Sequence, residues 1–301
     1  MNITRILIGA IAVSVMLSTM AFPAFAAKPT AGGTSIIVVT PGDLAADSLE
    51  SDLLEKYTAY LNGKWFFYND ETDVIDNSLG SFVVGPGTPP MGLGGTQISV
   101  SGTQRRNLAT YRFSGTRLAD ITTLAFSTYN PSAGNGGPAN RSGYLNFNVD
   151  FNGSDTWQRR LVFTPPPGQI VQNLWQEWDA IKGGSALWHY SGSKWPNTNT
   201  PGSTAKNWAQ ILSQYPGIRV RVTDSWLGIR VGSPYPNGYT ENVDAFKFGT
   251  AAGTTVFDFE PGADFCKDGG WQNSSSPNFR NQGDCVSYVQ SNVNAIGNKS
   301  K

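Results

Sequence analysis

Carboxylate pairs are the first candidates for chemistry in this 301-residue chain. Glu177 and Asp179 stand two positions apart in LWQEWDA, and Asp258 and Glu260 stand two apart in FDFE. In a strand, residues two apart share a face, with Cα atoms about 6.5 to 7 Å from each other. Glycosidase carboxylates flank the sugar from separate strands, so this adjacency argues only weakly for a glycoside hydrolase.

His189 is the only histidine in the chain and the centre of a second candidate site. Trp188, Tyr190 and Trp195 surround it in a segment that we interpret as a loop. A nucleophilic triad is disfavoured, because no G-x-S-x-G elbow occurs and no serine can be paired with the histidine from sequence. Indole rings stack on the apolar face of a pyranose, and a histidine can hydrogen-bond a sugar hydroxyl. We expect either an aromatic sugar-binding platform or a loop that closes over the core with its aromatic side chains buried.

A polar sheet face is predicted from the alternation in GYLNFNVDF, where apolar residues face the core and polar residues face outward. The following strand adds to this face, as do later arginine-bearing strands if they join the same sheet. Planar amides and guanidinium groups suit sugar hydroxyls or uronate carboxylates. An ordinary solvated sheet face is the alternative. The candidate ligand-binding residues on this face are Asn146, Asn148, Asp150, Gln158, Arg160, Arg219, Arg221 and Arg230.

An acidic segment early in the chain offers oxygen ligands for a metal. Its carboxylates belong to Asp70, Glu71, Asp73 and Asp76. Calcium prefers such ligands, and Asp244 or Asp258 from late strands could complete a structural calcium site. Because no EF-hand pattern is present, a solvated loop is the alternative. No other cofactor is expected.

The two cysteines, Cys266 and Cys285, enclose the run KDGGWQNSSSPNFRNQGD near the C-terminus. In an oxidising compartment a disulfide between them would close a loop of a size that stabilises a protein by roughly 3 kcal/mol. Two thiols without a nearby histidine cannot fill a tetrahedral zinc site. We therefore predict a disulfide.

The N-terminus has the pattern of a cleavable signal peptide. Arg5 is followed by an uncharged, mostly apolar stretch and then by Ala24-Phe25-Ala26, so we predict cleavage after residue 26. A membrane anchor is the alternative, which Pro23 and the directly following small-residue site disfavour. We expect a secreted, extracellular or periplasmic protein that is soluble and monomeric, with no membrane span after cleavage. A nucleic-acid partner is not favoured, because the 22 basic and 22 acidic side chains balance.

The composition is typical of an all-β secreted domain, with 15% charged residues, 12% aromatic residues, 34 glycines and 18 prolines. From residue 64 onward, short apolar runs alternate with turn residues, which predicts an antiparallel β-sandwich of jelly-roll type with one or two short helices. Helices are expected over 47–63 and over 205–215, the second capped by Ser203 or Thr204. The expected divisions are a signal peptide (1–26), a lead-in strand and amphipathic helix (27–63), the sandwich (64–260) and a disulfide-closed C-terminal appendage (261–301).

Several segments resemble a family of uncharacterised secreted bacterial β-sandwich proteins of jelly-roll or lectin-like type. They are KWFFYNDETDVID, LATYRFSGTRLADITTLAFSTYN, YLNFNVDF with WQRRLVF, LWQEWDA, and NVDAFKFG with TTVFDFEP. The resemblance covers roughly residues 64–260. The tail is similar to a short two-cysteine cassette found at the C-terminus of secreted bacterial proteins, and neither resemblance implies an activity. The family's tryptophan-rich loop reads ALWHYSG here, and residues 45–63 look like an insertion.

The leading functional hypothesis is non-catalytic binding of an extracellular or cell-surface polysaccharide. A jelly-roll polysaccharide lyase acting on uronate polymers is one alternative, with arginine and an amide neutralising the uronate and tyrosine or histidine moving the proton. The stretch from Tyr235 to Tyr239 resembles the tyrosine-rich strand of alginate lyases but lacks that strand's lysine, and the other lyase motifs are not found. A structural component of the extracellular matrix or cell surface is the third hypothesis.

Overall fold

The computed structural model describes residues 32–47, 63–132, 136, 139–151, 159–183, 185–196, 205–222, 226–232, 234–274 and 277–290. The predicted signal peptide, most of the expected helix over 47–63, and Gln158 lie outside these residues. Within the described ranges, no helix is both long and apolar enough to cross a membrane.

The first sheet is built around one long strand, β15. Its N-terminal half pairs with β5 and its C-terminal half with β16, while β7 pairs with it from Asn242 to Thr250. All pairings in this sheet are antiparallel except that of β1 with β16. The expected lead-in strand is therefore part of the sandwich. The strands are β1 (Thr34–Val39), β4 (Gly80–Val84), β5 (Gly94–Gly102), β7 (Ile121–Tyr129), β10 (Trp175–Asp179), β15 (Tyr235–Thr250) and β16 (Gly253–Phe259).

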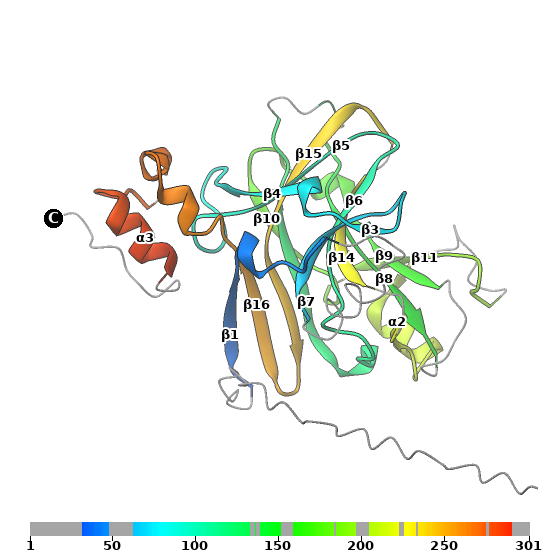
Figure 1. The fold of residues 1–301 in the computed structure, drawn as a ribbon. Coiled ribbons are helices and arrows are strands. Elements are labelled where there is room, and N and C mark those ends of the chain that lie inside the picture. The colour runs from blue at the N-terminus through cyan, green and yellow to red at the C-terminus, as the bar shows by residue number, and fades with distance from the viewer. Residues whose placement is uncertain are drawn as a thin grey trace, which may run out of the picture.

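The second sheet has the strand order β12-β11-β9-β8-β14-β6-β2-β3, and β13 also pairs with β8. Its strands are β2 (Trp65–Asn69), β3 (Val74–Ile75), β6 (Arg105–Thr110), β8 (Tyr144–Asp150), β9 (Arg160–Phe163), β11 (Leu187–Ser191), β12 (Lys206–Asn207), β13 (Arg219–Val220) and β14 (Leu227–Gly232). Consecutive strands from β5 to β8 alternate between the two sheets, as in jelly-roll connectivity. The predicted all-β sandwich is confirmed (Figure 1).

The core lies between the sheets and is rich in aromatic side chains. The ring of Trp65 makes edge-to-face contacts with Phe246, Phe257 and Phe259 at centroid distances of 5.2, 5.3 and 5.1 Å. Such pairs contribute about 0.5–1.5 kcal/mol each beyond the apolar area they bury. The alternation predicted for β8 is confirmed on its inward side, where Leu145, Phe147 and Val149 are fully buried.

Short helices connect the strands. The predicted second helix is α2 (Trp208–Gln214), and its cap is Asn207 rather than Ser203 or Thr204, because β12 comes directly before it. Asn207 and Gln210 form a capping box, which satisfies backbone N–H groups of the first turn. Single 3-10 turns occur at η1 (Pro41–Asp43), η2 (Asn77–Leu79), η3 (Leu118–Asp120), η4 (Pro167–Gln169), η5 (Ala263–Cys266) and η6 (Gly270–Asn273).

The C-terminal cassette, described here over residues 261–274 and 277–290, contains the predicted disulfide between Cys266 and Cys285. The half-cystines form a small apolar cluster with Phe279 and with Leu93 of the sandwich. Helix α3 (Gln282–Gln290) ends the described chain. Figure 1 shows the cassette, in orange and red, beside the sandwich and at the opposite end of the view from β8, β9 and β11.

Candidate functional site

A pocket of about 450 Å³ opens on the outer face of the second sheet, the face turned away from the first sheet. Its walls come from β8, β9, β11, β14 and the start of β15, and from the segments before β8 and after β9. Three arginines line it, Arg141, Arg160 and Arg230, together with Tyr144 and Tyr235. No carboxylate is among its described lining residues, and we call it the arginine pocket.

Strand register brings these side chains together. Arg230 of β14 is paired with Tyr144 of β8, and Arg160 of β9 is paired with Asn148 of β8 and Ser191 of β11. Residues paired across antiparallel strands point to the same face. The polar positions of four adjacent strands therefore meet at one place on the outer face.

Arg230 is the anchored arginine of the pocket. It forms an ion pair with Asp70, and its Nε donates a hydrogen bond to Asn107 Oδ1 at 2.9 Å. Its guanidinium carbon also lies 5.6 Å from the centre of the Trp226 ring. Because Asp70 offsets its charge, Arg230 contributes fixed geometry more than free positive charge.

Arg160 is different, because it forms neither an ion pair nor a hydrogen bond with any side chain in the described part of the structure. It is half-buried. Burial lowers the pKa of Arg160, and the nearby positive charge of Arg230 lowers it further. A guanidinium that has lost part of its hydration without gaining an anion is poised to bind one.

A buried hydrogen-bond network backs the pocket. The rings of Tyr235 and Tyr239 are stacked with centroids 4.5 Å apart, and the Tyr239 hydroxyl donates to Glu241. Ser142 Oγ, from a residue that lines the pocket, donates to Glu241 Oε1 at 3.0 Å. Burial raises the pKa of Glu241 to about 7, although its hydrogen bonds act in the opposite direction. This network fixes the loop before β8, which carries Arg141.

The expected aromatic platform is not formed. Trp188 and Tyr190 point into the core and Trp195 is also buried, with exposed fractions of 0%, 2% and 6%. The segment is strand β11 rather than a loop, so its side chains alternate between the two faces. His189 is exposed on the outer face, directly across from Val162, which lines the arginine pocket. The interpretation in which the aromatic side chains are buried is the one that the structure supports.

The predicted polar face is present but is not a solvated surface. Asn146, Asn148 and Asp150 are all buried, with exposed fractions of 0%, 7% and 1%. Neither polar side-chain atom of Asn146 has a hydrogen-bond partner within the described residues. Arg219 lies 3.8 Å from Asp150 in an ion pair, and Arg221 donates its backbone N–H to the Asn148 carbonyl. Of the predicted arginines, the structure therefore brings only Arg160 and Arg230 into the arginine pocket.

The carboxylates of the early acidic segment form ion pairs and hydrogen bonds with other groups of the protein. Arginines pair with the first two carboxylates, since Asp70 contacts Arg105 at 3.3 Å as well as Arg230, and Glu71 pairs with Arg105 at 3.1 Å and with Arg106. Asp73 accepts a hydrogen bond from the Tyr68 hydroxyl at 2.8 Å, and Asp76 caps a turn through Ser78 N at 3.0 Å. Asp244 and Asp258, either of which could have completed a calcium site here, lie instead in another cluster beside the loop 91–93.

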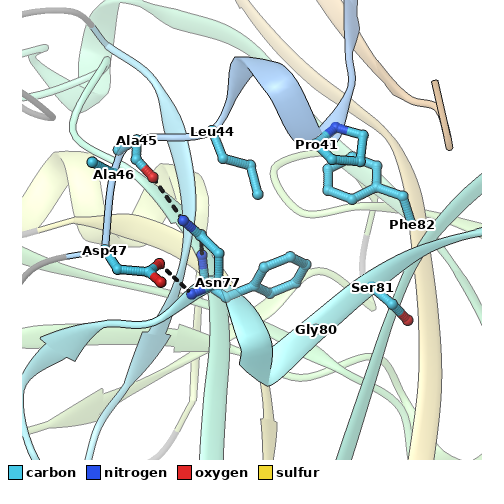
Figure 2. Close-up of a pocket in the computed structure, with 10 residues that line it drawn as sticks. Pro41, Leu44, Ala45, Ala46, Asp47, Asn77, Gly80, Ser81 and Phe82 are labelled. Carbon is cyan, nitrogen blue, oxygen red and sulfur yellow. Dashed lines mark hydrogen bonds between the residues drawn. The ribbon is translucent and has the colours of Figure 1, made fainter. Parts of the chain in front are cut away.

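A larger pocket of about 550 Å³ lies between residues 41–47 and β4. Figure 2 shows that its walls are mainly apolar and that both hydrogen bonds drawn involve Asn77. Asp47, the charged member of its described lining, accepts from Asn77 N at 2.8 Å, and Asn77 Nδ2 donates to Ala45 O at 2.7 Å. These hydrogen bonds hold the N-terminal segment against the sandwich. Few polar groups of the pocket therefore remain to bind a ligand.

The sequence analysis did not identify Arg141 and Tyr144 as site residues. The alternation of β8 was a sufficient signal for Tyr144, but Arg141 sits in a loop whose position only the folded chain defines. No family model matches the chain, no curated protein matches it, and no solved structure matches it. Its function is therefore inferred from the geometry of the arginine pocket.

Proposed function

We propose that this protein is an exported polysaccharide-binding protein and that the arginine pocket binds an acidic sugar unit, a uronate or a sulfated sugar. The observation that carries the proposal is Arg160, a half-buried guanidinium without an anionic partner among the described residues, in a pocket that no described carboxylate lines. A guanidinium fork can bind a carboxylate or a sulfate with two parallel hydrogen bonds.

The rest of the pocket suits a sugar. Its volume lies within the range of sites that bind small molecules. Ser142, Thr164 and Ser191 contribute hydroxyl groups, and Tyr144 and Tyr235 contribute rings with polar ends. The local positive charge stands in a chain with balanced overall charge, which favours recognition of individual anionic groups over wrapping of a polyphosphate backbone. The disulfide supports an oxidising location outside the cytoplasm.

The test is binding of wild type and Arg160→Gln to a panel of neutral and acidic polysaccharides by affinity electrophoresis, followed by calorimetry. We expect wild type to bind at least one uronate or sulfated polymer, more weakly as ionic strength rises. Arg160→Gln should lower that affinity about 10- to 100-fold, which corresponds to roughly 1.5–3 kcal/mol.

The matched control is Arg280→Gln, because Arg280 is exposed on the cassette and the substitution removes the same charge. It should bind as wild type does. The proposal fails if no polymer binds, or if Arg160→Gln and Arg280→Gln bind equally well. Trp188→Ala is not a suitable probe, because Trp188 is buried and its removal would disturb the fold instead of a surface.

A uronate lyase is the second candidate, favoured by one observation. Tyr144 lines the arginine pocket together with Arg160, and Asn148 lies directly across from Arg160 on the neighbouring strand. An amide and a guanidinium could neutralise a uronate while tyrosine moves the proton. Cleavage would produce unsaturated uronates, which absorb in the ultraviolet. A steady rise in absorbance that Tyr144→Phe abolishes would establish this candidate in place of simple binding.

A further inference from the structure

Three acidic side chains are buried together on the first sheet, at its junction with the C-terminal cassette. Asp244 and Asp258 are both 0% exposed, and Glu260 is 4% exposed. Burial raises the pKa values of Asp244 and Glu260, and the negative charge of Asp258 raises both further. We call this group the acidic cluster.

The strand geometry explains how the acidic cluster forms. Asp258 of β16 and Glu260 just beyond its end are two residues apart, so they share a face while Phe257 and Phe259 point into the core. Asp244 lies on the neighbouring strand β15, where the register shifts between Asp244 and Lys247 and Ala245 has a φ of 49°. This bulge turns the Asp244 carboxylate toward β16, where it accepts a hydrogen bond from Phe259 N at 3.0 Å.

The loop 91–93 covers the acidic cluster and donates backbone hydrogen bonds to two of its carboxylates. Met91 N donates to Asp244 Oδ2 at 3.2 Å, and Leu93 N donates to Glu260 Oε1 at 2.7 Å. Between these residues Gly92 has a φ of 45°, and a Cβ atom there would lie 1.3 Å from Glu260 Oε1 and 3.1 Å from Asp258 Oδ1. The glycine thus lets the loop approach two carboxylates at once.

Three carboxylate oxygens have no partner. Both oxygens of Asp258 and the Oε2 atom of Glu260 are buried without a hydrogen bond in the part of the chain that the structure describes. No described lysine, arginine or histidine forms an ion pair with them. Burying ionised oxygens without a counter-charge is costly, so neutral pH demands either protons or a cation at this place.

We propose that Asp258 and Glu260 bind one divalent cation of the calcium class and that this ion fixes the C-terminal cassette to the sandwich. Calcium takes six to eight oxygen ligands and accepts a bidentate carboxylate, so three unpartnered oxygens on two side chains form about half of its shell. In the described residues, no three His, Cys, Asp or Glu side chains are gathered as a metal site, so backbone carbonyls and water must complete the shell.

The link to the cassette runs through two residues. Leu93, whose N–H is bound to Glu260, packs in the apolar cluster with Cys266, Phe279 and Cys285. Tyr288 of α3 packs against the same apolar cluster. A cation that neutralises the carboxylates would hold the loop 91–93 in place, and with it the surface on which the cassette packs.

The test is calcium binding to full-length mature protein after dialysis against a chelator. Calorimetry of wild type should show one calcium ion per chain and about 10-fold weaker binding of magnesium, which demands a stricter octahedral shell. Asp258→Asn should lower the calcium affinity about 100-fold. Glu177→Gln is the matched control, since Glu177 is a half-exposed carboxylate on the same sheet, and it should bind calcium as wild type does.

Limited proteolysis provides a second readout that tests the structural role. Calcium should slow cleavage within the cassette about 10-fold in wild type and not in Asp258→Asn. If Asp258→Asn does not fold, Glu260→Gln takes its place with the same expectations. Absence of saturable calcium binding by wild type overturns the proposal, as does equal affinity in Asp258→Asn and Glu177→Gln. These results do not depend on whether the arginine pocket binds a polysaccharide.

Discussion

The arginine pocket and the acidic cluster both contain charge without a partner in the described structure, but of opposite sign and on different sheets. Arg160 faces a pocket open to solvent, and its guanidinium is half-buried. Asp258 is covered by the loop 91–93 and is fully buried. The difference in burial decides what each region can accept, because an open pocket admits one unit of a large chain whereas a covered cluster admits only a small ion.

The ion pair between Arg230 and Asp70 shows a buried charge that is neutralised within the protein. Arg230 and Asp70 are nearly buried, with side-chain exposures of 5% and 11%, and they form an ion pair. Asn107 provides a further hydrogen bond to Arg230. The buried charge of Arg230 is therefore paired, whereas Arg160 and Asp258 have no such partner among the described residues, and these are the two places where a ligand is expected.

Asp70→Asn is expected to have the largest effect, because it converts the paired charge into an unpaired one. Arg230 would remain buried without its carboxylate, and breaking a buried pair in this way costs about 4 kcal/mol of unfolding free energy. Chemical denaturation measures the change. The control is Glu177→Gln, which breaks a half-exposed pair with Lys247 and should cost under about 1 kcal/mol. If the two variants lose the same unfolding free energy, leaving Arg230 buried and unpaired has no special cost, and the prediction is wrong.

Glu241→Gln tests a buried carboxyl group behind the arginine pocket that accepts hydrogen bonds but forms no ion pair within the described residues. Burial raises its pKa from 4.5 to about 7, so its protonation stabilises the folded state below about pH 4.5, and this contribution is lost as the pH rises through 7. The variant removes that dependence. We expect its unfolding free energy relative to wild type to rise by roughly 3 kcal/mol between pH 4.5 and pH 8.

The measurement is a series of denaturation curves across this pH range. The quantity of interest is the difference between the two proteins, because the acidic cluster titrates in the same range in both. A difference that stays constant with pH would show that Glu241 is ionised throughout and would contradict the effect of burial.

The two faces of single strands could be predicted from the sequence, since they depend on a period of two residues. The inward side of β8 and the shared face of Asp258 and Glu260 both follow from it. The same period was present in the segment containing Trp188 and Tyr190, but aromatic residues between glycines are as typical of binding loops as of strands. Only packing against Phe147 and Phe163 distinguishes the two.

The two regions of unpaired charge could not be predicted in this way. The arginine pocket requires the register of β8, β9 and β14, which non-local pairing sets. The acidic cluster requires a bulge at Ala245 and a glycine at position 92, far apart in sequence. The expected metal site at Asp70 illustrates the same limit, because nothing in the local sequence shows that Arg230 would reach this carboxylate first.

Gly92→Ala is expected to have a smaller effect on stability than Asp70→Asn and a decisive effect on the acidic cluster. A side chain at its φ of 45° is strained, and the added Cβ must displace Glu260 Oε1 and break its hydrogen bond to Leu93 N. Strain and the lost bond together should cost about 2 kcal/mol. Gly102→Ala is the matched control, with a φ of 57° and no atom within 4 Å of the new Cβ, so it should cost about 1 kcal/mol from strain alone.

Calcium titration of these two alanine variants separates the effect of backbone strain from the effect of moving the Glu260 carboxylate. Gly102→Ala should bind calcium as wild type does, whereas Gly92→Ala should bind it much more weakly, because the added Cβ displaces the Glu260 carboxylate. Both substitutions place alanine at a left-handed backbone position, so a difference in calcium affinity reports the position of the Glu260 carboxylate and not backbone strain. If both variants bind calcium equally well, calcium binding does not depend on the position of the Glu260 carboxylate, and the assignment of Glu260 as a ligand is wrong.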